Sequence, residues 1–216
     1  DRSPSRGLGD VYKRQVPRSD VDNFIQSLPF SLTPDQLEAV NAIYKDMTSP
    51  IKMNRLVLGD VGSGKTVVGL CAIVMNTIAG YQGALMAPTE VLARQHYESL
   101  KKMAPQVKFG LIVGNMSKSE KKQVLLNLAL GHLDCLIGTH AILNEKVEFK
   151  NLGLVITDEQ HRFGVNQRNI IENKGHGVDV IYMSATPIPR TYALGLYGDM
   201  DLSLIHISEP TRRTPI

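Results

Sequence analysis

Short apolar runs of strand length alternate along the chain with longer segments whose apolar residues recur at helical spacing. The apolar runs cover residues 55–58, 83–87, 107–113, 133–137, 152–157 and 178–183. Helical patterns precede or separate them, over residues 34–47, 67–75, 89–103 and 117–130. Regular alternation with nearly continuous apolar strands predicts a parallel sheet covered by helices on both faces. The expected fold is α/β, with three layers and a mainly parallel central sheet.

Two of the predicted helices begin with a capping box. Thr33 precedes Pro34 and has Gln36 three residues on, and Ser117 has Glu120 at the same spacing. The first of these helices should turn one apolar face to the core, formed by Leu37, Val40, Ile43 and Tyr44. Gln36 has a second interpretation, because its amide could present one donor and one acceptor to an adenine edge. The sequence leaves both interpretations of Gln36 open.

A glycine-rich loop joins the first predicted strand to a buried helix. It reads Gly59-Asp60-Val61-Gly62-Ser63-Gly64-Lys65-Thr66. Its three glycines let the backbone turn N–H groups around phosphate oxygens, and the following helix adds its positive end. Lys65 can reach the β- and γ-phosphates, and Thr66 can hold Mg²⁺. The loop predicts a nucleoside triphosphate site, and the alternative is an ordinary glycine-rich turn between strand and helix.

Asp158-Glu159-Gln160-His161 directly follows an apolar strand. Neighbouring side chains on a strand point to opposite sides, so Asp158 can face a metal while Glu159 faces the attacking water. Phosphoryl transfer needs both roles. Gln160 and His161 could sense the γ-phosphate, although His161 could equally pack in the core. Taken alone, the acidic pair could be a solvated turn.

Polar clusters follow five of the predicted strands directly. They cover residues 59–66, 88–90, 138–140, 158–161 and 184–187. The carboxyl ends of parallel strands share one edge of the sheet, so these clusters are expected to converge there. Ser184-Ala185-Thr186 offers two hydroxyls that could relay the state of the nucleotide, or simply cap the next helix.

Several residues near these strand ends and helix starts suit sequence-independent contacts with nucleic-acid phosphates. They are Thr89, Arg94, Thr139, His140, Arg162 and Arg190. Interleaved aromatic residues are absent from this set, so base stacking is not indicated. A further basic cluster, Lys118, Lys121 and Lys122, is interpreted as a solvated helix face.

The net charge of +3 changes little in this interpretation. Residues 1–15 and 202–216 resemble translated sequencing-adaptor DNA and are excluded from the fold. These two ends carry charges of +2 and +1, which leaves residues 16–201 with no net charge. The basic balance is therefore no evidence for nucleic-acid binding. We expect the natural protein to continue beyond both ends.

The composition is typical of a soluble globular domain, with 43% hydrophobic and 21% charged residues. The apolar helical segments are too short to span a bilayer, and the N-terminus lacks a signal-peptide pattern. A cytoplasmic protein with no membrane partner is expected. Cys71 and Cys135 lie in apolar runs and are expected to be core residues of a reducing compartment.

The full series of motifs resembles the motors of superfamily-two helicases, and within them the RecG-type ATP-dependent DNA helicases. The resemblance covers about Leu28 to Asp201. In chain order it includes an adenine-reading motif and motifs I, Ia, Ib, II and III, which match residues 30–36, 59–66, 87–96, 138–142, 158–165 and 184–191. The sequence Asp158-Glu159-Gln160-His161 in motif II favours this family over the transcription-repair coupling translocases, which usually have a second Glu in this motif.

The resemblance implies a first RecA-like P-loop NTPase lobe over residues 30–201. It implies ATP and Mg²⁺ as cofactors, and branched DNA such as stalled forks and Holliday junctions as the partner in repair and recombination. The implied site has ATP-binding residues (Phe30, Gln36 and 59–66), catalytic residues (Lys65, Glu159, Gln160, His161), metal ligands (Thr66, Asp158), coupling residues (Ser184, Ala185, Thr186, Arg190) and DNA contacts (Thr89, Arg94, Thr139, His140, Arg162).

The family also has an N-terminal wedge domain and a second motor lobe with an arginine finger, and neither is expected in this chain. Residues 16–29 are interpreted as a linker or the tail of that wedge domain. An arginine finger contributes strongly to the rate of phosphoryl transfer, so this fragment is expected to bind nucleotide but hydrolyse it poorly. The alternatives are a lobe of a transcription-repair coupling translocase and a truncated, non-catalytic nucleotide-binding module.

Overall fold

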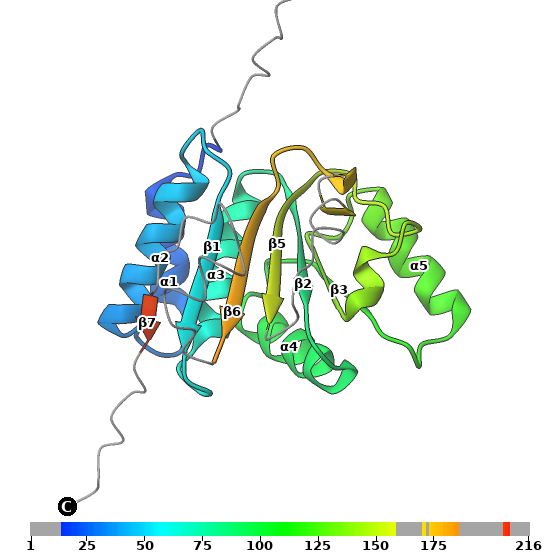
Figure 1. Ribbon diagram of the computed structural model, residues 1–216, viewed down its shortest axis with the longest axis horizontal. Coiled ribbons are helices and arrows are strands. Elements are labelled where there is room, and N and C mark those ends of the chain that lie inside the picture. The colour runs from blue at the N-terminus through cyan, green and yellow to red at the C-terminus, as the bar shows by residue number, and fades with distance from the viewer. Residues whose placement is uncertain (1–13, 159–169, 172, 186–204, 208–216) are drawn as a thin grey trace, which may run out of the picture.

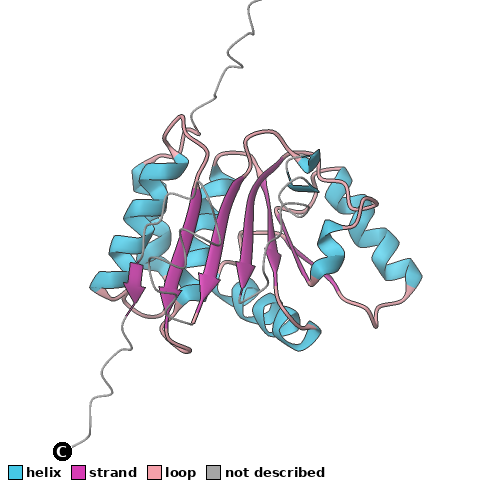
Figure 2. Cartoon of the chain, in the orientation of Figure 1, coloured by secondary structure: helices cyan, strands magenta, loops and turns pink. Residues whose placement is uncertain are grey.

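The computed structural model describes residues 14–158, 170–171, 173–185 and 205–207. A parallel sheet forms its centre (Figures 1 and 2). Its strands are β1 (Asn54–Gly59), β2 (Gln82–Met86), β3 (Phe109–Ile112), β4 (Cys135–Gly138), β5 (Leu152–Asp158), β6 (Asp179–Ser184) and β7 (Ile205–Ile207). They lie in the order β3-β4-β2-β5-β6-β1-β7, and each neighbouring pair is parallel. The predicted α/β fold is confirmed.

Helices cover both faces of the sheet. They are α1 (Arg18–Ser27), α2 (Pro34–Met47), α3 (Lys65–Ile78), α4 (Glu90–Met103), α5 (Lys118–Ala129) and the short 3-10 helix η1 (His140–Leu143). Figure 1 shows α1 and α2 near β1 at one end, and α5 at the other end beyond β3.

Two hydrophobic cores separate the three layers. Val57 packs with apolar residues of α1 to α4 in one core, whereas Leu56 and Leu58 pack in the other, which contains Leu128 of α5 and Ile142 of η1. Successive residues of a strand point to opposite faces. The middle of β1, Leu56 to Leu58, is continuously apolar because both of its faces are covered there.

Residues 16–29, predicted to be a linker or the tail of a wedge domain, contain helix α1. Val21, Phe24 and Leu28 are buried in the core that contains Val57, and Ile25 packs against the same core. The spacing of these four residues is that of one helix face. Pro17 precedes the helix and provides no side-chain cap among the described residues, so the usual start signal is missing. Whether α1 ends a preceding domain stays a prediction.

Other elements differ from the prediction in detail. Strand β3 is shorter than the predicted 107–113, because its register with β4 pairs only Phe109 to Ile112. Leu37 was expected on the core face of α2 but is 36% exposed, and Gln36 and Ala39 are buried instead. Strand β7 falls in the segment predicted to be foreign, and its Ile205 pairs with Val57.

The two cysteines are buried and free, as expected. Burial raises the pKa of Cys71 to about 12, and burial also raises the pKa of Cys135. Both thiols therefore stay protonated at neutral pH. Across the described residues, no helix combines the length and apolar character needed to cross a membrane.

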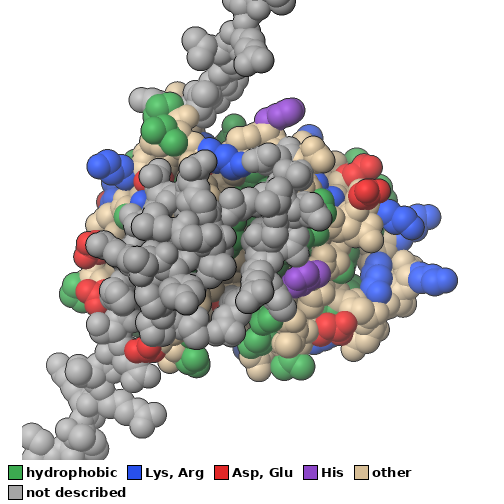
Figure 3. All heavy atoms as spheres, viewed as in Figure 1, with side chains coloured by type: hydrophobic (Ala, Val, Ile, Leu, Met, Phe, Trp, Pro, Cys, Tyr) green, Lys and Arg blue, Asp and Glu red, His purple; other side chains and the backbone are tan. Residues whose placement is uncertain are grey.

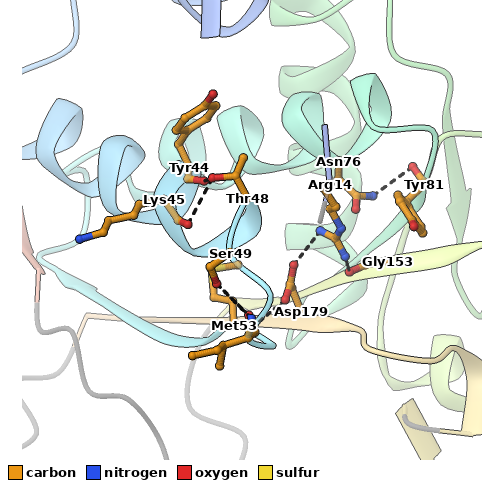
Figure 4. Close-up of polar contacts among 11 residues, drawn as sticks. Arg14, Tyr44, Lys45, Thr48, Ser49, Met53, Asn76, Tyr81, Gly153 and Asp179 are labelled. Atoms are coloured by element: carbon orange, nitrogen blue, oxygen red, sulfur yellow. Dashed lines mark hydrogen bonds and ion pairs between the residues drawn. The ribbon is translucent and has the colours of Figure 1, made fainter. Parts of the chain in front are cut away.

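A buried polar cluster ties the amino-terminal ends of the strands together (Figure 4). Asp179, the first residue of β6, accepts a 2.7 Å hydrogen bond from the backbone N–H of Met53. Its other carboxylate oxygen lies 2.7 Å from Nη1 of Arg14, and Nη2 of Arg14 donates to the carbonyl of Gly153. Burial raises the pKa of Asp179 to about 6, against the opposing effect of Arg14. The ion pair is therefore held inside the fold at the edge opposite to the glycine-rich loop.

Candidate functional site

The glycine-rich loop has the geometry of a strand–loop–helix turn between β1 and α3. Gly62 and Gly64 adopt φ angles of +86° and +83°, which glycine reaches without steric cost. Gly64 is the N-cap of α3, and the backbone N–H of Ser63 donates to the carbonyl of Asp60 at 3.0 Å. The loop thus brings the amino-terminal end of a buried helix to the carboxyl edge of the sheet, as predicted.

Two side chains of this loop are buried polar groups. Nζ of Lys65 donates to the carbonyl oxygens of Gly59 at 2.5 Å and Asp60 at 2.9 Å. Ser63 is 1% exposed, and its hydroxyl makes no hydrogen bond to any described residue. Buried polar atoms are nearly always satisfied by protein, water or a ligand. The hydroxyl of Ser63, and the ammonium of Lys65 if it leaves its neutral carbonyl partners, are among the groups of the loop that an anion could engage.

Gln36 links α2 to the loop. Its Oε1 accepts from the backbone N–H of Thr33 at 2.9 Å, and its Nε2 donates to the carbonyl of Ser63 at 2.8 Å. A Cβ added to Gly64 would lie 2.2 Å from this Nε2. The capping box is confirmed, and the same side chain braces the loop. Each amide atom keeps one further hydrogen-bonding position, so contact with a base stays a prediction.

A cleft of about 480 Å³ lies where α1 meets the start of α2. Apolar and polar surface both line it, and the lining residues are Ile25, Gln26, Leu28, Pro29, Phe30, Ser31, Leu32 and Leu37. Phe30 is 43% exposed. The cleft therefore places an aromatic side chain at the same helix start that holds Gln36.

The strand register places Asp158 at the same edge as the loop. Asp158, the last residue of β5, pairs with Met183 of β6, and the next residue, Ser184, pairs with Leu58 of β1. Only β6 separates β5 from β1, so their backbones lie roughly 10 Å apart, two strand spacings. Ser184 is buried and Ala185 is partly exposed. The predicted convergence of 59–66, 158 and 184–185 is confirmed for the described residues.

Asp158 has a partner that the sequence analysis did not assign. Nε2 of His96, on α4, lies 2.5 Å from Oδ2 of Asp158. The two side chains are 11% and 13% exposed. His96 is the last residue of the segment that resembles motif Ia (87–96), and the sequence analysis gave it no role of its own. Its position three residues after buried Ala93 and four before buried Leu100 was the available signal.

Four of the residues predicted to contact DNA lie at or near the starts of α4 and η1, the helices that follow β2 and β4. Thr89 is the N-cap of α4, where its hydroxyl accepts from the backbone N–H of Leu92 at 3.2 Å. Arg94 is exposed and donates to the side chain of Asn115, in the loop after β3. Thr139 precedes η1, and His140 is exposed.

The basic cluster lies apart, on α5. Lys118 and Lys122 are exposed, and Figure 3 shows basic side chains gathered over this end of the molecule. Nζ of Lys121 donates to the carbonyl of Gly114 at 2.7 Å. Lys121 thus fixes the loop after β3, whereas the other two face solvent as predicted.

Six predicted site residues lie outside the described residues. They are Glu159, Gln160, His161, Arg162, Thr186 and Arg190. The predicted roles of these six therefore stay predictions.

The donor set suits a magnesium–nucleotide complex better than a protein-only metal site. No three His, Cys, Asp or Glu side chains of the described ranges gather into a metal cluster. Mg²⁺ usually binds through one or two protein oxygens together with phosphates and water. Thr66, in the first turn of α3, and Asp158, at the end of β5, supply such oxygens from the same edge.

Comparisons with known proteins agree with this geometry. The profile of the DEAD/DEAH box helicase family matches residues 33–194. The chain is 52% identical to the ATP-dependent DNA helicase RecG of Streptococcus pneumoniae over 190 residues, which cover 88% of this chain and 28% of that protein. It is 47% identical to the RecG of Bacillus subtilis over 207 residues, which cover 95% and 30%.

A solved structure of RecG bound to a three-way DNA junction is also similar. It is 45% identical with a TM-score of 0.82, covering 94% of this chain and 27% of that one. The chain therefore spans less than a third of the length of these relatives. The family match covers well over half of the chain. The chain belongs to the DEAD/DEAH box helicase family, and that membership implies ATP binding.

Proposed function

We propose that this chain is the nucleotide-binding motor lobe of an ATP-dependent DNA helicase similar to RecG, acting on branched DNA in DNA repair and recombination in the bacterial cytoplasm. The observation that carries the proposal is the strand register, which brings the glycine-rich loop, Ser184 and Asp158 to one edge. The similarity to a RecG structure bound to a three-way junction supports branched DNA as the partner.

The loop binds the phosphates of ATP. Backbone N–H groups of residues 62–66 and the positive end of α3 surround the phosphate oxygens. In the structure the ammonium of Lys65 folds back on the carbonyls of Gly59 and Asp60. Binding exchanges these neutral acceptors for charged phosphate oxygens, which form stronger hydrogen bonds. Phe30 and the outer amide positions of Gln36 contact the adenine.

The edge residues provide the rest of the chemistry. Thr66 and Asp158 would hold Mg²⁺, which would supply positive charge to the phosphate oxygens when bound. Glu159 orients and deprotonates the attacking water, and Gln160 and His161 detect the γ-phosphate. Ser184, Ala185, Thr186 and Arg190 pass the nucleotide state on to the DNA contacts Thr89, Arg94, Thr139, His140 and Arg162.

Calorimetric titration of the 216-residue chain with ADP and Mg²⁺ tests the nucleotide site. Lys65→Ala is expected to lower the affinity about 10- to 100-fold, because a charge-assisted hydrogen bond contributes roughly 1.5–3 kcal/mol. Lys118→Ala, on exposed α5, is the matched lysine control and should bind like the parent. If Lys65→Ala also binds like the parent, the phosphate-loop assignment is wrong.

A further inference from the structure

His96 occupies a core-facing position of α4. The buried residues of this helix are Ala93, His96 and Leu100, which share one face because they are three and four residues apart. An imidazole on such a face needs a polar partner, since an unsatisfied buried polar group is costly. The carboxylate of Asp158 supplies it, with Nε2 of His96 2.5 Å from Oδ2.

The pairing joins two elements that the chain topology brings together at the carboxyl edge. Helix α4 follows β2, and β2 lies beside β5, with Met86 paired to Thr157. His96 therefore reaches across to the residue after Thr157. Among the hydrogen bonds of the described residues, this is the one that holds the Asp158 side chain. The second carboxylate oxygen of Asp158 is left available to a ligand.

We propose that His96 is a positioning residue for the nucleotide-bound metal. Its Nε2–H donates to Oδ2 of Asp158 and fixes the rotation of the carboxylate that would hold Mg²⁺. Hydrogen bonds from outside the ligand shell orient metal ligands in this way, and losing one typically costs 10- to 100-fold in metal affinity. The inference rests on the proposed function, and it assigns a role to a residue of α4 that touches neither nucleotide nor metal.

The test separates metal binding from nucleotide binding. Mn²⁺ affinity of the ADP complex is measured by electron paramagnetic resonance, and ADP affinity without metal is measured by calorimetry. His96→Ala is expected to weaken Mn²⁺ binding about 10- to 100-fold and to leave metal-free ADP binding unchanged. Ser99→Ala, at an exposed position of the same helix, should match the parent in both.

Two conservative variants distinguish positioning from packing. The Nε2 amide of glutamine reaches about as far as the imidazole Nε2, whereas the shorter asparagine does not. His96→Gln should therefore recover Mn²⁺ affinity to within a few-fold of the parent, and His96→Asn should behave like His96→Ala. Thermal melts identify any variant that fails to fold, and His96→Gln keeps the test decisive if His96→Ala is such a variant.

A measurement without nucleotide tests the contact itself. The imidazole ¹⁵N–¹H spectrum should show a hydrogen-bonded Nε2–H for His96 that shifts in Asp158→Asn and stays in place in Ser99→Ala. The inference is overturned if His96→Ala binds Mn²⁺ as well as or better than the parent. It is also overturned if metal-free ADP affinity falls by the same factor, or if Asp158→Asn leaves the imidazole signal unchanged. Absence of ADP binding by the parent would instead contradict the proposed function.

Discussion

Two aspartates at opposite ends of neighbouring strands have different surroundings. Asp179 begins β6 and is enclosed by partners that hold the fold together, the backbone N–H of Met53 and the guanidinium of Arg14. Asp158 ends β5 and has a single hydrogen-bonding partner among the described residues, His96 of α4. Both carboxylates are paired and largely buried, with side-chain exposures of 6% and 13%.

The difference shows that burial and pairing alone do not identify a functional carboxylate. The amino-terminal ends of parallel strands are closed by structural contacts, whereas ligands bind at the carboxyl ends. At the amino edge burial raises the pKa of Asp179 to about 6, and no loop with a phosphate-binding geometry lies among its described partners. At the carboxyl edge Asp158 lies two strands from Lys65 and Thr66. Its place in the sheet, and not its pairing, is what supports the role with nucleotide that we propose for Asp158.

The largest effect is expected in the glycine-rich loop at the carboxyl edge. Gly64→Ala combines the left-handed backbone, which costs a non-glycine residue roughly 1–2 kcal/mol, with a Cβ 2.2 Å from Nε2 of Gln36. Displacing Gln36 also breaks its hydrogen bond to Ser63. We expect about 3 kcal/mol of lost stability together with weaker ADP binding, measured by urea unfolding and calorimetry.

Gly62 provides the matched control for this prediction. Its φ of +86° is nearly the same, but nothing lies within 4 Å of an added Cβ. Gly62→Ala should therefore lose only the backbone contribution of roughly 1–2 kcal/mol. Equal losses in the two variants would show that the contact between Gly64 and Gln36 contributes nothing.

Asp179, at the amino-terminal ends of the strands, should make the stability of the protein depend on pH. The pKa of Asp179 is raised from 3.8 in the unfolded chain to about 6 in the folded protein, mainly by burial. The folded state therefore binds more protons between these two values, and the free energy of unfolding falls as the pH rises from about 4 to 6. The contribution of this residue is of order 2 to 3 kcal/mol.

Asp179→Asn removes this titration. Urea unfolding at several pH values should show a shallower fall for the variant than for the parent between pH 4 and 6. In Arg14→Met the opposing positive charge is lost, so the fall should continue to higher pH than in the parent. A parent and an Asp179→Asn variant with parallel profiles would contradict the structural role given to this carboxylate.

The smallest effect compares two helix caps. Thr33→Ala and Ser117→Ala each remove a hydroxyl that accepts from the backbone three residues on, at a cost of about 1 kcal/mol of stability. Only the first cap holds Gln36, which braces the loop through Ser63. We expect Thr33→Ala alone to weaken ADP binding, by a few-fold in calorimetry. If Ser117→Ala also weakens ADP binding, the claim that the Thr33 cap supports the nucleotide loop through Gln36 is contradicted.

Local sequence signals predicted the part of the site that lies in continuous segments. The loop was predictable because its glycines, Lys65 and Thr66 have fixed spacing between an apolar strand and an apolar helix. The carboxyl edge was predictable because polar residues follow apolar strands, and parallel strands end together. The capping box of Thr33 was predictable for the same local reason.

Contacts between distant segments could not be predicted in this way. His96 and Asp158 are 62 residues apart, and Arg14 and Gly153 are 139 apart. Nothing in the local pattern around His96 distinguishes an imidazole that holds a carboxylate from one that simply packs. Helix α1 was missed because its three apolar residues lie among polar ones without a capping signal. Leu37 was wrongly predicted to face the core. The contact of Gln36 with the loop turns α2 so that Gln36 is buried and Leu37 is exposed.

The central claim is that the loop and Asp158 hold one metal–nucleotide complex at the carboxyl edge of the sheet. A crystal structure of the chain with a non-hydrolysable ATP analogue and Mn²⁺, with the metal located by its anomalous signal, tests it most directly. The account predicts Mn²⁺ between the phosphate oxygens, Thr66 and Asp158, with Asp158 bound directly or through one water. A nucleotide bound away from Lys65, or a metal with no link to Asp158, would contradict it.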